Sequence, residues 1–231
     1  MRKIALTLAA TLSLLTCAAA HAGPIGIHPG LKVGVTVANF DYASISSSTQ
    51  ALESRSQMTF GGYLRLDIGR VFSLQPELQY VPSGAKGSFV VDDGITPTSV
   101  DGILKMNYLE FPILAKFRFP GGGALAPNFY LAPSAAVNLA SKLEADLSAF
   151  GLSPEEGGVD IKDEVQSLLF GGAIGGGFDM RAGKGILTLD ARYSKSFSDI
   201  FNGTTADGST GFFDAADANN SSLSVTLGYA F

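Results

Sequence analysis

Charged side chains stand at alternate positions in several short segments of the chain, where they could form salt bridges. Side chains of an extended strand point to opposite faces in turn, so each such row lies on one face of its strand. Basic and acidic members are nearly balanced, which predicts a network of cross-strand ion pairs. The ten residues are Lys32, Arg65, Lys116, Arg118 and Arg192, with Asp67, Glu77, Glu110, Asp179 and Asp190.

Side chains suited to acid–base catalysis or metal binding are scarce. A hydrolase generally needs a histidine as general base, and His28 is the only histidine after residue 22. We expect His28 in a tail that precedes the first strand. The acidic stretches 92–94 and 207–217 lack the ligand spacing of a calcium loop. The sequence therefore predicts no enzyme, no metal site and no cofactor.

The first 22 residues have the pattern of an export signal. Arg2 and Lys3 precede an apolar run at 4–15, and Ala20-His21-Ala22 provides a small-x-small cleavage site. We therefore expect a cleaved signal peptide at 1–22 and one domain at 23–231.

Cys17 offers an alternative, acylation as a lipoprotein, but Thr16 is a poor residue to precede a lipidated cysteine. Cleavage after Ala22 would remove the only cysteine, so no disulfide is expected in the exported domain.

Charge and hydropathy argue against a nucleic-acid-binding protein and against a protein with membrane-spanning helices. The formal net charge is −5 and Lys and Arg do not cluster, so binding to nucleic-acid phosphates is not expected. Beyond residue 22, no stretch reaches the 18 or so apolar residues of a membrane helix. A transmembrane β-strand needs only about 9 to 11 residues of alternating character, which leaves a membrane location open.

Eight segments show that alternation. In the first, Leu31, Val33 and Val35 alternate with Lys32 and Gly34. The predicted strands are 30–40, 58–69, 71–81, 103–119, 128–140, 166–181, 186–197 and 221–231.

The connections between these segments alternate in length. Those at 69–70, 120–123 and 182–185 are short. Long connections are expected at 42–57, 82–101, 141–165, which could hold a short helix, and 198–220. Short periplasmic turns, long outer loops and an even strand number are typical of outer-membrane barrels. The pattern therefore predicts an all-β, eight-stranded antiparallel up-and-down transmembrane β-barrel with short periplasmic turns and long extracellular loops.

The energetic cost of placing charges in lipid decides which face of each strand points into the barrel. A soluble, lipocalin-like barrel would point its apolar face inward. In a membrane barrel, a Lys or Arg facing hydrocarbon at mid-depth costs about 2 to 4 kcal/mol, so the charged face must line the lumen. Eight strands leave just enough room for side chains to fill the interior, which predicts a plugged lumen. Aromatic residues near strand ends are expected at the two interfaces: Tyr80, Phe119, Phe129, Tyr193, Tyr229 and Phe231.

The last strand resembles the C-terminal signal that hands outer-membrane barrels to their assembly machinery. The signal has an aromatic last residue, an aromatic residue two positions earlier and alternating apolar residues before them. We expect this strand to pair with the first strand around Val33 and so close the sheet. The signal residues are Leu223, Val225, Leu227, Tyr229 and Phe231.

Five short motifs are spread along nearly the whole exported chain: Gly30-Leu31-Lys32-Val33-Gly34, Pro76-Glu77-Leu78-Gln79-Tyr80, Tyr108-Leu109-Glu110-Phe111-Pro112, Arg192-Tyr193 with Asp199-Ile200, and Leu227-Gly228-Tyr229-Ala230-Phe231. In these motifs the chain resembles the PorT-like family of small outer-membrane β-barrels. That resemblance implies an eight-stranded barrel in the outer membrane of a Gram-negative bacterium and no shared catalytic motif.

Two functions follow from this interpretation. The first is a non-enzymatic, integral outer-membrane barrel whose surface loops serve interaction or envelope structure. The alternative is a narrow porin-like channel for ions or very small solutes. The expected partners are outer-membrane lipid, the barrel-assembly machinery and periplasmic chaperones during biogenesis, and an unknown extracellular partner of the loops.

Overall fold

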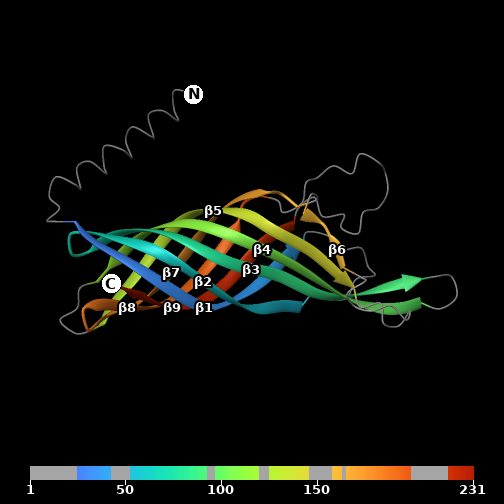
Figure 1. The fold of residues 1–231 in the computed structure, drawn as a ribbon, viewed down its shortest axis with the longest axis horizontal. Helices are drawn as coiled ribbons and strands as arrows, with labels where there is room; N and C mark the ends of the chain where they lie inside the picture. The colour runs from blue at the N-terminus through green and yellow to red at the C-terminus, as the bar shows by residue number, and fades with distance from the viewer. Residues whose placement is uncertain are drawn as a thin grey trace, which may run out of the picture.

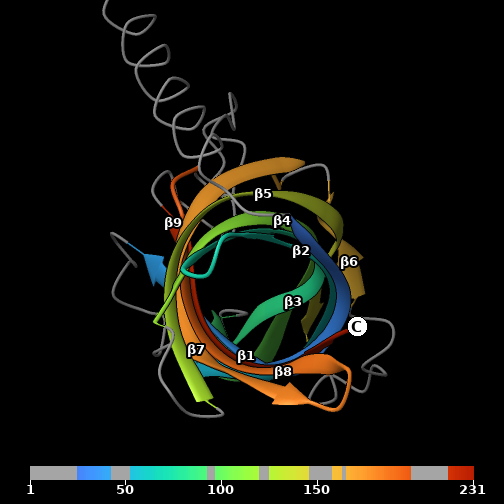
Figure 2. The same ribbon diagram turned by 90° about the vertical axis from the view of Figure 1, so that its left-hand side faces the viewer.

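The chain folds into a closed antiparallel β-barrel in the computed structural model, which describes residues 25–42, 53–92, 97–119, 125–145, 158–162, 165–198 and 218–231 (Figures 1 and 2). The strands in this part of the chain are β1 (Gly26–Tyr42), β2 (Glu53–Ile68), β3 (Phe72–Asp92), β4 (Pro97–Arg118), β5 (Leu125–Ala145), β6 (Gly158–Asp160), β7 (Leu168–Ala182), β8 (Gly185–Ser196) and β9 (Ala218–Ala230).

Eight of these strands form the barrel wall, as predicted. Each long strand pairs antiparallel with its neighbour along the chain, and β9 returns to pair with β1. Val33 lies opposite Leu227 in this closing pair, which confirms the expected pairing of the two strands around Val33. The short β6 pairs only with the end of β5, with Lys142 opposite Asp160. Closure leaves no free edge along the body of the sheet.

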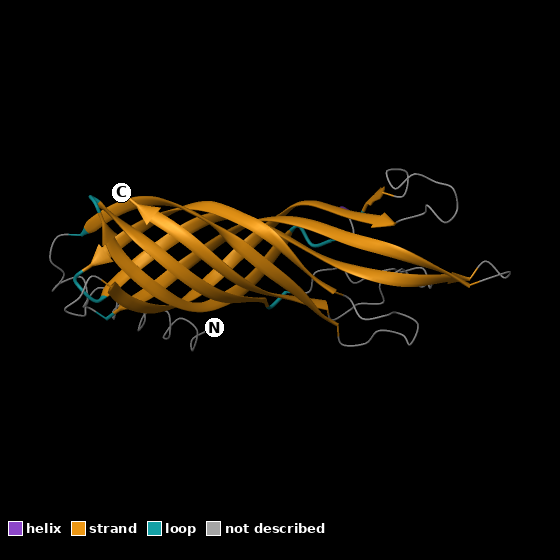
Figure 3. Cartoon of the chain, turned by 90° about the horizontal axis from the view of Figure 1, so that it is seen from below, coloured by secondary structure: helices purple, strands orange, loops and turns teal. Residues whose placement is uncertain are grey.

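The two ends of the barrel differ in their connections (Figure 3). At one end, here called the turn end, residues 69–71 join β2 to β3 and residues 183–184 join β7 to β8, whereas 120–124, between β4 and β5, lie outside the described residues. Gly69 and Gly183 adopt positive φ angles of 74° and 63° there, a conformation that glycine takes without steric cost. At the opposite end, the loop end, the connections at 43–52, 146–157 and 199–217 lie outside the described residues.

The prediction of a long loop at 82–101 was largely wrong. Most of 82–101 is strand, because β3 and β4 stay paired from Pro82 opposite Asn107 to Asp92 opposite Pro97. The backbone ladder continues beyond the body of the barrel, where the apolar alternation that reveals a strand is no longer required. The same reason explains why β2 and β5 extend beyond their predicted ends, to Glu53 and Ala145.

Two smaller predictions also need correction. His28 lies within β1, opposite Arg65, and not in a tail, because strand pairing begins at Gly26. The acidic segment 141–165 supplies the end of β5 and the strand β6 where it is described. Residues 146–157, where a helix was considered, lie outside the described part.

The barrel wall has the predicted inner and outer faces. Phe60 on the outside of β2 is 57% exposed, whereas Arg65 on the inside is 1% exposed. The same contrast holds along β8, where Leu189 is exposed and Asp190 is buried. The barrel is therefore turned inside out relative to a soluble protein, with charges in its interior and apolar side chains on its surface. Among the described residues, no helix is long and apolar enough to cross a bilayer.

Candidate functional site in the barrel lumen

Charged residues near the turn end form the first of two lumen clusters. We call Arg65, Asp67, Lys116, Arg118 and Asp179 the turn-end cluster. Arg65 lies 2.9 Å (Nε to Oδ1) from Asp67 and 2.8 Å (Nη1 to Oδ2) from Asp179. Arg118 Nη2 lies 2.6 Å from Asp67 Oδ1, and Lys116 Nζ lies 4.0 Å from Asp179 Oδ1. Three strands on different sides of the lumen, β2, β4 and β7, thus meet through two carboxylates.

The central cluster consists of Lys32, Glu77, Asp190 and Arg192. Lys32 Nζ donates to both Glu77 carboxylate oxygens at 3.0 Å, and Arg192 Nη2 donates to Glu77 Oε2 at 2.7 Å. Two glutamines of the same strand, Gln75 and Gln79, also donate to this carboxylate. Glu77 is therefore a buried hub whose charge is balanced and whose oxygens are fully used.

Tyr130 joins the two clusters. Its hydroxyl donates to Asp190 Oδ1 at 2.8 Å and accepts from Arg192 Nε at 3.0 Å. The Lys116 ammonium and the Arg192 guanidinium lie 5.7 and 5.4 Å from the ring centroid, within the range of cation–π attraction. A Cβ at Gly175 would overlap the Tyr130 hydroxyl, so glycine at that position makes room for the ring. The charge pattern alone gave no sign of this tyrosine.

Little empty space remains between the clusters. A cavity of about 10 Å³ lies among Lys32, Gln75, Lys116 and Asp190, which is at the lower limit for one water molecule. Buried charges are tolerated only when they are paired and hydrogen-bonded. The clusters therefore fill the described lumen at this level with fixed, paired side chains.

Apolar side chains fill the lumen nearer the loop end. The apolar cap, as we call it, combines inward residues of β4 and β7 with two residues of the connection between β6 and β7. Ile161 and Val165 of that connection are 6% and 1% exposed. The Ile161 amide donates to the Ser141 carbonyl at 3.1 Å and so fixes the connection to β5. The members are Leu104, Met106, Tyr108, Ile161, Val165 and Leu169.

The predicted charge network did not include this cap. Its only sequence signal is that Leu104, Met106 and Tyr108 continue the inward row of β4 beyond Glu110. An inward apolar row on a barrel strand indicates that another segment covers it.

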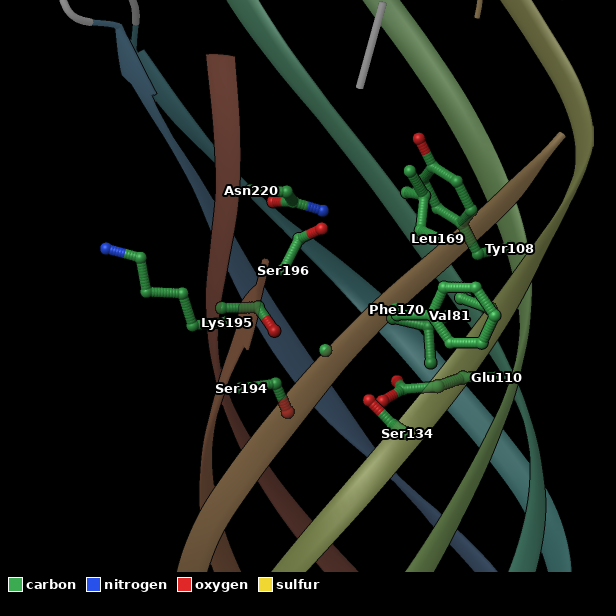
Figure 4. A pocket seen from close by; sticks show the side chains of 13 residues that line it. Val81, Tyr108, Glu110, Ser134, Leu169, Phe170, Ser194, Lys195, Ser196 and Asn220 are labelled. Carbon is green, nitrogen blue, oxygen red and sulfur yellow. The ribbon is translucent and has the colours of Figure 1, made fainter. Parts of the chain in front are cut away.

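Glu110 lies between the central cluster and the apolar cap, apart from the nine other predicted charges. Within the described residues, no Lys or Arg nitrogen lies within 4.0 Å of its carboxylate, whereas each of the other nine has an oppositely charged partner within that distance. It lines a cavity of about 60 Å³ together with Ser134, Ser194, Asn220 and cap residues Tyr108 and Leu169 (Figure 4). The structure therefore divides the ten charges into two ion-paired clusters and one separate carboxylate.

The predicted assembly residues lie on the outer face of β9, except Phe231, which directly follows the strand. Leu223, Val225 and Leu227 are about half exposed. The Tyr229 hydroxyl donates to the Ala182 carbonyl at 3.1 Å, and its ring contacts that of Phe231 edge-on at 5.2 Å. The Phe231 amide donates to the Pro29 carbonyl at 2.8 Å, and its own carbonyl oxygen lies 3.1 Å from His28 Nδ1. His28 thus lies at the closing seam.

In the described part of the chain, no group of three or more His, Cys, Asp or Glu residues could hold a metal ion. The acidic stretch 207–217 and residues 93–94 lie outside the described residues.

Comparison with known proteins places the chain in a family. A family model for the outer membrane protein beta-barrel domain matches residues 19–202. No curated protein matches the sequence significantly.

Solved structures with a similar fold are remote in sequence. One is Ail, the attachment invasion locus protein of Yersinia pestis, which was solved in complex with the heparin analogue sucrose octasulfate. The match has 13% sequence identity and a TM-score of 0.42, and it covers 89% of this chain and 99% of the Ail chain. Neisserial surface protein A is 14% identical over 89% of this chain and 99% of its own, with a TM-score of 0.43. OprG from Pseudomonas aeruginosa is 13% identical over 91% of this chain and 96% of its own, with a TM-score of 0.44.

The family match spans most of the chain, and the closed barrel with an apolar outer surface is what such a domain requires in lipid. The chain therefore belongs to the outer membrane protein beta-barrel domain family and is an integral outer-membrane β-barrel protein.

Proposed function

We propose that this protein is a non-enzymatic outer-membrane barrel with a plugged lumen, whose loop end faces outward for surface interaction or envelope structure. One observation carries the proposal: Glu77, Lys32 and Arg192 meet across the lumen in a buried, fully bonded ion-pair layer. Such a layer leaves no continuous file of water through a barrel of this width.

The lumen is better suited to structure than to catalysis. Nine of the ten lumen charges are held in ion pairs, Glu110 being the exception, and His28 lies at the turn end, in β1. A surface hydrolase would need its base near the outer rim. The finer resemblance to PorT-like barrels agrees with this role, since that resemblance implies no catalytic motif.

The route to the membrane is a second part of the proposal. Residues 1–22 serve as a cleaved signal peptide, and the exported domain 23–231 is delivered by periplasmic chaperones to the assembly machinery. The outer face of β9, from Leu223 to Phe231, is the segment that this machinery recognises. Cleavage near Ala22 rather than acylation of Cys17 can be tested by the mass of the mature protein.

The orientation of the loops can be tested on intact cells. A protease added outside should cut in the connections at 43–52, 146–157 or 199–217 and leave the turn-end connections intact. The purified protein should also migrate faster on a denaturing gel before heating than after, as a folded barrel does. Cleavage restricted to the turn end would reverse the proposed orientation.

The assembly role of β9 has a separate test. Deletion of Phe231 removes a hydrogen bond to Pro29 and the ring contact to Tyr229. We expect far less protein in the outer membrane of cells but near-normal refolding into detergent micelles. Normal assembly in cells would contradict this role and leave the plugged barrel untouched.

A narrow channel is the alternative function, because the turn-end and central clusters line the lumen with charged side chains that ions could follow. It requires the turn-end and central clusters to separate enough to admit water and ions. Conductance measurements distinguish it from the plugged barrel.

A further inference from the structure

Three exposed basic residues lie at the turn end of the barrel. Arg70 is in the connection between β2 and β3, and Arg181 and Lys184 are at the connection between β7 and β8. None of the three forms an ion pair or a hydrogen bond through its side chain within the described residues. We call them the turn-end rim. Their charges are therefore available to a partner outside the barrel.

No exposed acid offsets the turn-end rim among the described residues at this end. Asp67 and Asp179 lie there, but both are paired inside the lumen with arginines of the turn-end cluster. Apart from the five lumen acids, every Asp and Glu of the chain lies in the loop-end connections or in the strand ends beside them. The molecule therefore carries positive charge at its turn end and its excess of negative charge at its loop end.

The turn-end rim lies beside exposed apolar side chains. Val71, which follows Arg70, is exposed. At the other turn, the Tyr229 hydroxyl donates to the Ala182 carbonyl, and the Tyr229 ring contacts the exposed Phe231 ring. Aromatic side chains favour the boundary between hydrocarbon and lipid head groups. The rim is therefore at the level where the phosphates of surrounding lipids lie.

The arrangement suits lipid head groups better than a dissolved phosphate ion. The β2–β3 and β7–β8 turns are separated on the sheet by β1 and β9, so a single small ion does not contact both. Separate head groups around the barrel can reach each turn. Lys and Arg can also lay their apolar stems along the hydrocarbon boundary while the charged group meets a phosphate. A dissolved ion gains nothing from the neighbouring apolar side chains.

We propose that the turn-end rim binds the head groups of anionic phospholipids in the leaflet that surrounds this end of the barrel. Attraction to an anionic membrane surface corresponds to roughly a fivefold preference for each Lys or Arg close to it. The loop end has exposed lysines too, but its excess of acids opposes the same preference. The barrel should therefore select anionic lipids at one end.

The first test counts the lipids that stay bound to the purified protein. Native mass spectrometry follows its release from micelles that contain equal amounts of phosphatidylglycerol and phosphatidylcholine. The wild type should retain the anionic lipid over the zwitterionic one by at least about fivefold. The triple variant Arg70→Gln, Arg181→Gln and Lys184→Gln should bring this ratio close to one. Equal retention of the two lipids by the wild type would overturn the proposal.

The matched control removes the same charge from the loop end. Its three substitutions are Lys86→Gln, Lys142→Gln and Lys195→Gln, all at exposed positions. This variant should keep a ratio close to that of the wild type. Faster gel migration before heating than after shows that each variant is folded. An equal loss of preference in both triple variants would overturn the assignment to the turn end.

The second test uses the wild type alone and so does not depend on the folding of a variant. The chain has no tryptophan, so its tyrosine fluorescence reports quenching by brominated lipids in vesicles. Brominated phosphatidylglycerol should quench more than brominated phosphatidylcholine in 0.1 M salt. The difference should disappear in 1 M salt, where the Debye length falls from about 10 Å to about 3 Å.

Two results of the second test would contradict the proposal. A preference that survives 1 M salt would show that charge attraction does not carry it. Loss of the preference when dissolved glycerol phosphate is added at the same phosphate concentration would indicate a site for free phosphate groups instead of lipid. Neither test requires a plugged lumen or a particular orientation of the loops, so its outcome is separate from the proposed function.

Discussion

Towards the turn end the lumen is filled by charged side chains, whereas towards the loop end it is filled by apolar ones. The charged part is built by the barrel strands alone, and most of its ion pairs join strands that the sheet already fixes. The apolar cap depends on Ile161 and Val165, which belong to a connection between strands. The first part should therefore resist change until the whole barrel unfolds, and the second should open locally.

This difference follows from the energies of the two kinds of contact. Removing one partner of a buried ion pair leaves the other charged and unpaired in the interior, which is strongly destabilising. Removing an apolar group leaves a cavity whose cost depends on how far the surroundings can relax. A connection held by a few contacts relaxes more easily than a closed sheet.

The largest effect is expected at the hub of the central cluster. Glu77→Gln leaves Lys32 and Arg192 without their shared carboxylate and should lower the free energy of unfolding by about 3 to 5 kcal/mol. Urea unfolding of the protein refolded in detergent micelles measures this. Replacing the lysine as well, as Lys32→Met with Glu77→Gln, should recover part of the loss. A loss below about 1 kcal/mol in the single variant would show that water already screens these charges.

A smaller and more local effect is expected in the cap. Ile161→Ala in a rigid core would cost about 2 to 5 kcal/mol, but detachment of the connection should limit the loss of global stability to less than that of Glu77→Gln. The Ile161 amide, which donates to Ser141, should exchange roughly 10 to 100 times faster with solvent deuterium, at about 1.4 kcal/mol per factor of ten.

Ile113→Ala on the outer face of β4 serves as the control for the cap, because it should leave exchange at Ile161 unchanged. If Ile161→Ala accelerated hydrogen exchange equally in the central cluster and in the cap, the two parts would not open separately.

The Tyr130 hydroxyl, which bonds two residues of the central cluster, should contribute less than the hub. Tyr130→Phe keeps the ring between Lys116 and Arg192 but removes the hydroxyl that bonds Asp190 and Arg192. The expected loss is about 1 to 3 kcal/mol in the same unfolding experiment, since charged partners are left unsatisfied. Tyr193→Phe, on the outer surface of β8, is the matched control and should be nearly neutral. A similar loss in both variants would mean that the hydroxyl bonds do not matter.

The smallest effect is expected outside the lumen. Lys105 Nζ lies 2.5 Å from Glu144 Oε2, but both side chains are more than a third exposed. Lys105→Ala should change the unfolding free energy by less than about 1 kcal/mol, because solvent screens such a pair. A loss as large as that of Glu77→Gln would remove the distinction between buried and exposed ion pairs in this barrel.

Much of the wall was predictable because each strand carries its own alternation. Leu31 and Lys32 already indicate which side of β1 faces inward. The pairing of the last strand with β1 around Val33 was also expected, whereas the partner of Val33, Leu227, is known only from the structure. The extension of β3 and β4 beyond Pro82 and Asn107 was missed, because strand pairing there continues without an apolar face.

The partners inside the lumen were less predictable. That Arg65 of β2 meets Asp179 of β7 depends on the tilt and stagger of the closed barrel, which no single strand encodes. Tyr130 was missed because its role arises from two neighbours on other strands. The separation of Glu110 from the other charges also depends on the cap, whose residues Ile161 and Val165 come from a segment without strand periodicity.

Single-channel recording of the full-length protein in planar lipid bilayers tests most directly whether the ion-paired layer closes the lumen. The wild type should show no steady conductance, and variants that remove the layer, such as Glu77→Ala combined with Arg192→Ala, should conduct more than the wild type. A steady wild-type conductance that disappears when the surroundings of Glu77 or Arg65 are repacked with apolar residues would contradict the plugged lumen and establish a narrow channel.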